Sequence, residues 1–385
     1  MNPRTLWIVA LVIESCATPS TPRDSGNGPS DASHDTDTDT DTETNRSDGS
    51  DIAVGTNDVS DVPMDSDAAD VSSPAPDASD VSIPTDAGDA AIDVPAVDAG
   101  SVACGSGFAT EVFRDDFDGA SVDTTRWDVV QQSPGGGMFT QLTAMLRANV
   151  TVAGGVLHVA SKRHCSNPYP GGAPEHPGAC TGTSYYSGGW LRSATSYAPG
   201  RGLAIFVAQM PAPVRGTFPG LWMRNTNGST LYGELDLIEQ WWDGAMIGRA
   251  SDSGTYSVTT WIQGSSTLAH TSGNTVGPYA ALHDRFHVWE VEWDASVPSI
   301  TYYYRDAPGA TRQLVRTVDQ TTSGLNGAVT RTQLASVLAL GWRPYIDFAV
   351  QPLSAYHDSP DDPPPAVDPY DPPDLLVDSV IVCAP

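Results

Sequence analysis

The sequence predicts an all-β domain over residues 104–385, a sandwich or a barrel, preceded by a disordered acidic segment. From Cys104 onward, short runs of alternating apolar and polar residues end at Gly, Pro, Asn or Asp, as is typical of strands. No stretch of this part keeps a helical period over twelve residues, and every tryptophan except Trp7 lies in it. Many short strands with turn signals indicate a β-sandwich or barrel. The clearest strand candidates are Gly202–Met210, Gly233–Trp241, His287–Trp293 and Ser299–Tyr304.

The segment Ala17–Ala103 differs in composition from the rest of the chain. It has no Phe, Tyr or Trp, and against 20 Asp or Glu it has only Arg23 and Arg46, so it carries −18 of the formal net charge of −28. Such a segment buries too little apolar surface to fold, and its like charges extend it. We expect a disordered spacer. Its Asp-Thr run at Asp35–Thr42 lacks the glycine-punctuated spacing of a calcium-binding array. The sequence argues against nucleic acid as a partner, because basic residues are not clustered anywhere.

Residues 1–16 have the features of an export signal. Arg4 precedes the apolar run Leu6–Ile13, which is too short to span a bilayer but suits a signal-peptide core. Ile13-Glu14-Ser15-Cys16 then resembles a bacterial lipobox, whose cysteine is lipidated and becomes the new N-terminus. We expect a secreted protein, anchored by a lipid on Cys16 at the bacterial outer membrane or cell surface. Glu14 departs from the lipobox pattern, so ordinary secretion with cleavage nearby is the alternative.

The four cysteines beyond Cys16 are Cys104, Cys165, Cys180 and Cys383. An even number in an oxidising compartment predicts two disulfides, and the residues alone leave three possible pairings. Metal binding by these four is disfavoured, because no Cys-x-x-Cys or Cys-His spacing is present.

The segment Gly233–Trp241 is the most informative part of the chain. Alternate residues of a strand share a face, so Glu234 and Asp236 point one way and the leucines between them point the other. Glu239 is out of phase by one residue, and a β-bulge at Leu237-Ile238 would return it to the acidic face. Acids in a row on one face repel each other, which lowers stability unless function requires it.

The spacing of the two glutamates suits a glycosidase. With the bulge absorbed they are about four strand residues apart, or roughly 13 Å along the backbone. Side chains that lean together by about 4 Å each leave roughly 5 Å between the carboxyl groups, as in a retaining glycosidase. Asp236 between them can hydrogen-bond Glu234 and tune its charge state. An exposed acidic edge strand is the structural alternative, but the apolar residues opposite indicate a strand packed in a sheet.

Glu-Leu-Asp-Leu-Ile-Glu resembles the E-[IL]-D-x-x-E signature of glycoside hydrolase family 16, in the bulged form of its laminarinase-like, agarase-like and carrageenase-like members. The resemblance extends over Cys104–Pro385, and six motifs in the family order are specific where one would be weak. The other five are Phe113–Gly119 with Trp127, Gly154–Val159, Phe218–Met223, Phe286–Trp293 and Leu376–Val382. The resemblance implies a concanavalin A-like β-jelly-roll sandwich.

The resemblance also implies roles for individual residues. Glu234 matches the nucleophile, Asp236 its assistant and Glu239 the acid/base. No cofactor is implied for catalysis, and the eight histidines show no His-Glu-x-x-His arrangement. Laminarinase-like members bind a structural calcium through acidic residues of the opening and closing strands. The matching residues are Asp116, which stands where Glu is usual, and Asp378.

Two departures leave the substrate open. Laminarinase-like members often carry a His one strand past the catalytic one, but Ser257–Trp261 has none. The usual Gly-Gly of a late strand is replaced within Phe348–Pro352. Candidates to stack on sugar rings are Trp222, Trp241, Trp242 and Trp190, because apolar sugar faces pack on aromatic rings. For each of them, packing in the core is the alternative.

The leading interpretation is a retaining endo-glycosidase that hydrolyses β-1,3-glucan or mixed β-1,3-1,4-glucan, acting as a monomer on a polysaccharide. One alternative is a galactan hydrolase, acting on agar or carrageenan, or a transglycosylase, with the same trio. A non-catalytic carbohydrate-binding protein of the same fold is another alternative. Such proteins usually lose one of the two glutamates, and both are present here.

The family fold also implies a pairing of the cysteines. Its opening and closing strands lie close together, which would bring Cys104, before Val112–Phe117, within reach of Cys383, after Leu376–Val382. Cys165 and Cys180 would then pair locally around the Pro/Gly-rich loop Pro168–Gly178, which would shape one end of the cleft.

If Ala17–Ala103 is a disordered spacer, limited proteolysis should remove it first. We expect a compact fragment that begins near Cys104 and keeps full activity, identified by mass spectrometry of the digest. Amide exchange within the spacer should be fast; slowed exchange there would contradict disorder.

Overall fold

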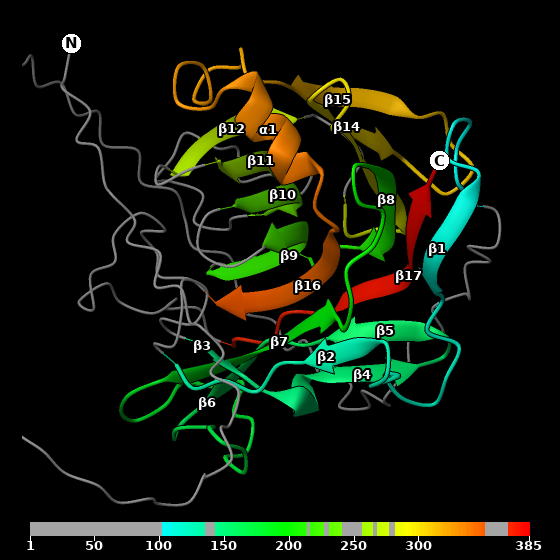
Figure 1. The fold of residues 1–385 in the computed structure, drawn as a ribbon. Helices are drawn as coiled ribbons and strands as arrows, with labels where there is room; N and C mark the ends of the chain where they lie inside the picture. Colours follow the sequence, from blue (N-terminus) through cyan, green and yellow to red (C-terminus); the bar gives the residue numbers. More distant parts are fainter. Residues whose placement is uncertain are drawn as a thin grey trace, which may run out of the picture. The chain divides into compact units, whose positions relative to one another are not determined.

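The computed structural model describes residues 102–134, 143–212, 214, 216–226, 231–240, 256–264, 268–276, 282–350 and 369–385. Cys16 and the predicted spacer up to residue 101 lie outside these residues. About half of the described residues belong to strands, which form two sheets packed face to face (Figure 1).

The first sheet contains the two end strands of the domain. Its strands are β1 (Thr110–Asp115), β4 (Val150–Ala153), β5 (Val156–Val159), β8 (Arg201–Gln209), β13 (His287–Asp294), β14 (Ser299–Arg305), β15 (Gln313–Val318) and β17 (Leu375–Ala384). Within the described residues their order is β15-β14-β13-β8-β17-β5-β4, and β1 also pairs with β17. The last strand of the chain therefore lies inside the sheet, paired with β8 on one side and with β5 and β1 on the other.

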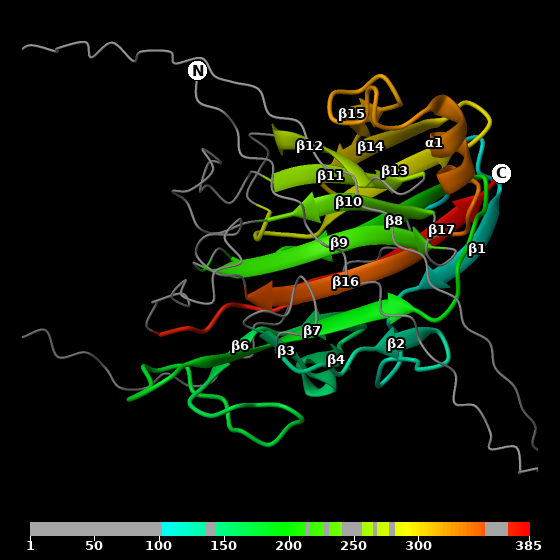
Figure 2. The same ribbon diagram turned by 60° about the vertical axis from the view of Figure 1, so that its left-hand side comes forward.

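The second sheet carries the predicted catalytic strand. Its strands are β2 (Trp127–Val129), β3 (Thr143–Met145), β6 (Lys162–His164), β7 (Tyr185–Ser193), β9 (Thr217–Thr226), β10 (Tyr232–Glu239), β11 (Tyr256–Gln263), β12 (Leu268–Val276) and β16 (Arg343–Val350). The order is β12-β11-β10-β9-β16-β7-β2, with β3 and β6 paired to β7. Figure 2 shows β10 well inside this stack of strands, with neighbours on both sides.

The main core lies between the two sheets. Alternate residues of β10, Leu235 and Leu237, point into it and pack in one cluster with residues of the first sheet such as Phe206 and Trp289. Fully burying one such side chain contributes about 1.5–3 kcal/mol. A second cluster covers the other face of the first sheet, where Val102 and its neighbours pack on β8, β13 and β17.

Helix α1 (Arg331–Leu338) is the one α-helix of the described residues. Its first turn is closed by a capping box, in which the Thr330 hydroxyl accepts from the Gln333 N–H and the Gln333 side chain accepts from the Thr330 N–H. Its buried face, Leu334, Val337 and Leu338, packs in the main core and touches β10, β11 and β13. Together with the short 3-10 helix η2 (Arg147–Asn149), it is a small exception to an all-β structure.

The predicted fold class is confirmed: the described chain is a jelly-roll sandwich of two sheets. The four clearest strand candidates correspond to β8, β10, β13 and β14, with ends that shift by at most a few residues. A stretch of eight residues is too short to show a helical period over twelve, which is why α1 was not predicted from the sequence.

Both disulfides have the expected pairing. Cys104 is bonded to Cys383 at a Cα–Cα distance of 5.9 Å, and Cys165 is bonded to Cys180 at 5.3 Å. The first bond follows from the sheet: β1 runs antiparallel to β17 with Glu111 opposite Cys383, so the residues just before β1 pass beside the end of β17.

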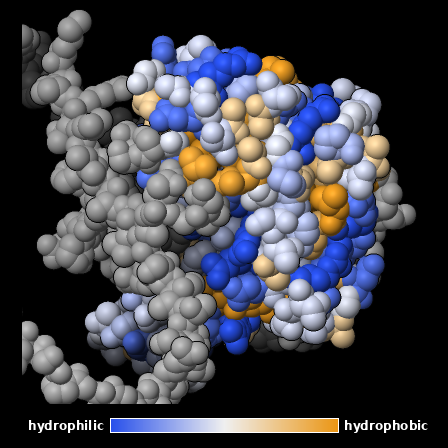
Figure 3. All heavy atoms as spheres, viewed as in Figure 1, coloured by the Kyte–Doolittle hydropathy of each residue, from blue (hydrophilic) through white to orange (hydrophobic). Residues whose placement is uncertain are grey.

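Few large apolar side chains are exposed among the described residues. They are Val112, Tyr169, Val297 and Leu314, and on the face seen in Figure 3 the hydrophobic residues form small patches separated by polar ones. No helix of the described chain combines the length and the apolar character that crossing a bilayer requires.

The two disulfides should differ in how much they stabilise the domain. Cys104–Cys383 closes a loop of 279 residues and Cys165–Cys180 one of 15. In the chain-entropy model the longer loop contributes about 5 kcal/mol and the shorter about 3 kcal/mol. We expect Cys104→Ala/Cys383→Ala to lose more unfolding free energy in urea than the control Cys165→Ala/Cys180→Ala. An equal or smaller loss would contradict this order.

Candidate active site

A β-bulge in β10 places the three acidic residues on one face. Against β11, Asp236 pairs with Thr259 and Glu239 with Ser257, so three steps along β10 match two along its neighbour. Against β9, the irregularity falls between Asp236 and Ile238. One extra residue in β10 restores the phase of Glu239, as the sequence predicted.

We call the face of the second sheet that carries these acids the site face. Its opposite side is the core, into which the leucines of β10 point. Residues directly opposite each other in an antiparallel sheet share a face, so the register defines three rows across the site face. The first row is Trp190, Asp347, Gly220, Glu239 and Ser257; the second is Arg192, Tyr345, Trp222, Asp236, Thr259 and Ser272; the third is Arg343, Arg224, Glu234, Trp261 and His270.

Glu234 lies in the third row between a cation and an aromatic ring. Its side chain is buried, and its carboxylate accepts a hydrogen bond from the Tyr232 hydroxyl. Burial raises the pKa of Glu234, while the Tyr232 hydrogen bond and the charge of Arg224 act in the opposite direction. The guanidinium of Arg224 lies 4.8 Å from the centre of the Tyr232 ring. Tyr232 therefore contacts both Arg224 and Glu234.

Asp236 lies in the second row, where its surroundings disfavour an ionised carboxylate. Burial, and next the charge of Glu234, hold the pKa of Asp236 well above its ordinary value; Glu239 and Asp347 add to the effect. Its Oδ2 is buried and makes no hydrogen bond with the described residues. A pKa raised in this way favours the protonated carboxyl group, which can donate a hydrogen bond to a neighbouring carboxylate.

Glu239, in the first row, is more accessible than the other two acids. Its Oε2 accepts a hydrogen bond of 2.5 Å from the Thr259 hydroxyl, and its backbone carbonyl accepts one of 3.4 Å from Ser257. Partial exposure suits a group that must exchange protons with a leaving group and with water.

Two of the four predicted sugar-stacking tryptophans can be placed. Trp222 lies on the site face beside Asp236 but is buried; its ring stacks on Tyr345 at 4.1 Å, and its indole N–H donates to Asp347 at 2.7 Å. Trp190 lies at the end of the first row opposite Ser257, and the centre of its ring is 6.4 Å from that of Tyr345. Trp241 and Trp242 lie outside the described residues. Sugar stacking by these tryptophans stays a prediction.

Several residues of the site face were not predicted from the sequence. Tyr232 and Arg224 contact the predicted nucleophile or its partner, and Asp347 adds a fourth carboxyl group. Tyr232 could have been found, because it has the same strand parity as Glu234 and stands two residues before it. Asp347 gave a weaker signal: it is the single charged residue within the apolar run Tyr345–Val350.

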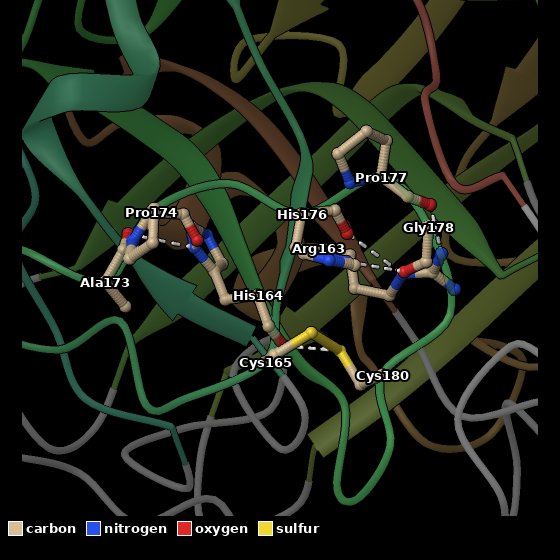
Figure 4. Close-up of a disulfide and its surroundings, with 9 residues drawn as sticks. All are labelled: Arg163, His164, Cys165, Ala173, Pro174, His176, Pro177, Gly178 and Cys180. Carbon is tan, nitrogen blue, oxygen red and sulfur yellow. Dashed lines mark hydrogen bonds between the residues drawn. A yellow bond between two sulfur atoms is a disulfide. The ribbon is translucent and has the colours of Figure 1, made fainter.

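The loop between Cys165 and Cys180 is anchored to β6, beside the first half of β7 (Figure 4). Arg163 donates to the carbonyls of His176 and Pro177. His164 Nδ1 lies 3.2 and 3.0 Å from the carbonyls of Ala173 and Pro174, so this nitrogen carries the proton, and Nε2 accepts from Ser187. The disulfide therefore reinforces a loop that is already held by two buried side chains.

The predicted calcium ligands lie on the first sheet, away from the acidic rows. Asp116 follows β1, whose pairing of Asp115 with Val380 carries it toward the Asp378 end of β17. Its Oδ1 is buried without a hydrogen-bond partner, while its Oδ2 accepts from Arg114 at 2.7 Å. One oxygen of Asp116 is thus available to an ion, but the guanidinium of Arg114 already neutralises part of the charge of this carboxylate. The one group of three close metal-ligand types among the described residues is Cys165, His176 and Cys180, whose sulfurs form the disulfide.

Comparison with known proteins gives structural likenesses only. No protein-family model and no curated protein sequence matches the chain. The laminarinase catalytic domain from Thermotoga maritima MSB8 is similar with a TM-score of 0.51 and 18% identity, covering 72% of this chain and 98% of that one. LamAcat from Zobellia galactanivorans (TM-score 0.49, 18% identity, 73% and 100% covered) and an endo-1,3-β-glucanase from Streptomyces sioyaensis (0.48, 21%, 74% and 99%) are also similar.

These structural neighbours are catalytic domains of glycoside hydrolases. At such low identity, the likeness to the Thermotoga domain shows that the chain shares its jelly-roll fold, and it covers nearly the whole of that domain. The identity of the substrate and the roles of the acids do not follow from the fold.

The hydrogen bond from Tyr232 can be tested on the pKa of Glu234. Because the bond favours the ionised carboxylate, Tyr232→Phe should raise the pKa of Glu234 further. Carboxyl carbon NMR titration measures the shift. Tyr304→Phe, which removes a hydroxyl bonded to His287 on the first sheet, is the control; an equal shift in both variants would contradict the assignment.

Proposed function

We propose that the protein is a retaining endo-glycosidase that hydrolyses a β-linked polysaccharide, with β-1,3-glucan or mixed β-1,3-1,4-glucan as substrate. One observation carries the proposal. The bulge in β10 brings Glu234 and Glu239 to the same face of the sheet, on either side of Asp236. Two carboxyl groups that flank a bound glycosidic bond are the machinery that this reaction needs.

In the first step, Glu234 acts as the nucleophile. Its carboxylate attacks the anomeric carbon while the carboxylic acid of Glu239 gives its proton to the leaving oxygen, so the C–O bond breaks without forming an alkoxide. The product is a glycosyl ester on Glu234 and a shortened sugar chain. Arg224 and the Tyr232 hydroxyl favour the ionised form of Glu234 before attack, since both oppose the rise in its pKa that burial causes.

In the second step, Glu239 takes a proton from water, and the oxygen of that water attacks the anomeric carbon to release Glu234. Asp236, whose raised pKa favours its protonated form, can donate a hydrogen bond to the Glu234 carboxylate as it leaves. This hydrogen bond stabilises the negative charge on the departing group. The configuration of the sugar is retained, because two displacements at the same carbon cancel.

The choice of β-glucan rests on the resemblance of the sequence motifs to laminarinase-like enzymes, and the fold shared with the Thermotoga maritima laminarinase domain agrees with it. A galactan hydrolase or a transglycosylase would use the same three acids. A non-catalytic carbohydrate-binding protein is disfavoured, because both glutamates are present and lie on the site face together with their supporting residues. Incubation with laminarin, lichenan, agarose and carrageenan, followed by product analysis, separates these possibilities.

Two further proposals rest mainly on the sequence. The export signal and Cys16 support a secreted enzyme anchored by lipid at the cell surface. The unpartnered oxygen of Asp116, near β17 and its Asp378, supports a structural calcium that would tie β1 to β17. No catalytic step passes through such an ion.

Replacing either glutamate should separate the two roles. We expect Glu234→Gln to abolish turnover with folding intact, because no nucleophile remains. Glu239→Gln should lose hydrolysis of polysaccharide but still cleave activated aryl glycosides slowly, since their leaving groups need no proton. Reducing-sugar release and aryl-glycoside assays measure this. The control is Glu111→Gln on β1, an exposed glutamate, and near-wild-type hydrolysis by both site variants would refute the catalytic roles.

A further inference from the structure

Asp347 is a buried carboxyl group of the site face to which the proposed mechanism gives no role. It lies on β16, inside the second sheet, and its side chain is 2% exposed. The register places it in the first row, opposite Gly220 of β9, which is in turn opposite Glu239 of β10. Asp347 and the proposed acid/base are therefore separated along this row by a single residue.

That single residue is a glycine, and the packing explains why. A Cβ atom on Gly220 would lie 3.0 Å from Oδ1 of Asp347, closer than ordinary contact allows. Any larger residue at this position would push the carboxyl group away and fill the space between Asp347 and Glu239. With glycine here, no side chain of β9 separates the two acids on the site face.

The two oxygens of Asp347 have different surroundings. Oδ1 accepts a hydrogen bond of 2.7 Å from the indole N–H of Trp222, which fixes the carboxyl group on the site face. Oδ2 is also buried, but it has no hydrogen-bond partner among the described residues. A buried polar oxygen without a partner is costly, by about 1–3 kcal/mol, and is unusual in a native structure.

We propose that Asp347 binds the substrate as a neutral carboxylic acid, with its proton on Oδ2 donated to a hydroxyl or ring oxygen of the sugar beside Glu239. Because Oδ1 already accepts from Trp222, the proton belongs on Oδ2. The row that contains Asp347 has no basic residue among the described ones. The group recognised is therefore an uncharged sugar oxygen, which excludes a sulfate or carboxylate substituent at this position.

The electrostatic surroundings agree with a neutral Asp347. From β10 it faces Glu239, Asp236 and Glu234, all acidic. The basic and phenolic groups around it are Arg224 on β9, Arg192 on β7, and Tyr345 and Arg343 on β16 itself; Arg192 is engaged by Asp128. Burial raises the pKa of Asp347 to about 8. The hydrogen bond from Trp222 opposes this rise, and the charges of Glu239 and Glu234 add to it.

This assignment has a consequence for stability that does not depend on any activity. Between the ordinary pKa of an aspartate and about 8, the folded protein holds a proton on Asp347 that the unfolded chain has released. Stability therefore falls as pH rises through this window. Asp347→Asn removes the titration but preserves size, an acceptor for Trp222 and a donor on the other atom.

The experiment compares the wild type with Asp347→Asn at a series of pH values. We expect the Tm of the wild type to fall relative to that of the variant from about pH 5 to about pH 8, and the Asp347 carboxyl carbon of the wild type to titrate above pH 7 in NMR. With laminarin as the probe, the wild-type KM should rise about tenfold from pH 7 to pH 9 as the donor ionises, whereas the KM of the variant stays constant. Asp374→Asn, at an exposed position paired with His158, controls for the change in net charge.

The proposal on Asp347 rests on the proposed function, but the two fail in different ways. If no polysaccharide is hydrolysed, the function is wrong, and the Tm series and NMR titration still show whether Asp347 is neutral. A carboxyl carbon that titrates near pH 4, or a constant Tm difference between the two proteins, overturns the neutral acid. A loss of more than about a hundredfold in kcat for folded Asp347→Asn at pH 6 also overturns it, because an ionised carboxylate would then be required.

Discussion

The structure depends on how four carboxyl groups are accommodated on one face of a sheet. Glu234, Asp236, Glu239 and Asp347 come from two strands with only β9 between them, and three of the four are buried. Charges at this density repel each other, and burial removes the water that would screen them. The site resolves the conflict by protonation and by local partners rather than by a cluster of cations. Burial raises the pKa values of Asp236, Asp347 and Glu234, and Arg224 and Tyr232 oppose the rise at Glu234.

Packing in the sandwich core offsets the unfavourable free energy of burying these acids. Leu235 and Leu237 alternate with the acids of β10 and anchor the strand in the main core. Strands on both sides hold the backbone, so the bulge changes the direction of Glu239 without freeing the strand. Trp222 contributes both packing and a hydrogen bond, since its ring packs on Tyr345 and its N–H holds Asp347 in place. A rigid sheet with an irregularity at one point is a way to place acids that a regular strand would send to opposite faces.

Much of the fold and part of the site could be predicted from the sequence. Alternation and turn residues located β8, β10, β13 and β14, and the spacing of Glu234, Asp236 and Glu239 implied the bulge. Those signals are local. The rows are not local, because they depend on which strands pair and in which register. Asp347 is more than a hundred residues from Glu239 in the sequence, and nothing near it indicates that Gly220 would bring the two together. Helix α1 was invisible for a different reason, since eight residues hold too few turns to show a period.

The bond between Cys104 and Cys383 changes how the domain would respond to a pull on its N-terminal side. Without it, tension applied through the chain before Cys104 would act on β1, an end strand that pairs only with β17 among the described strands, and could peel it away one hydrogen bond at a time. The covalent bond instead delivers the tension to β17, which is paired on both sides within the first sheet. Several strands then share the load in shear. A pull on the segment before Cys104 would therefore leave β1 paired with β17 and the sandwich intact.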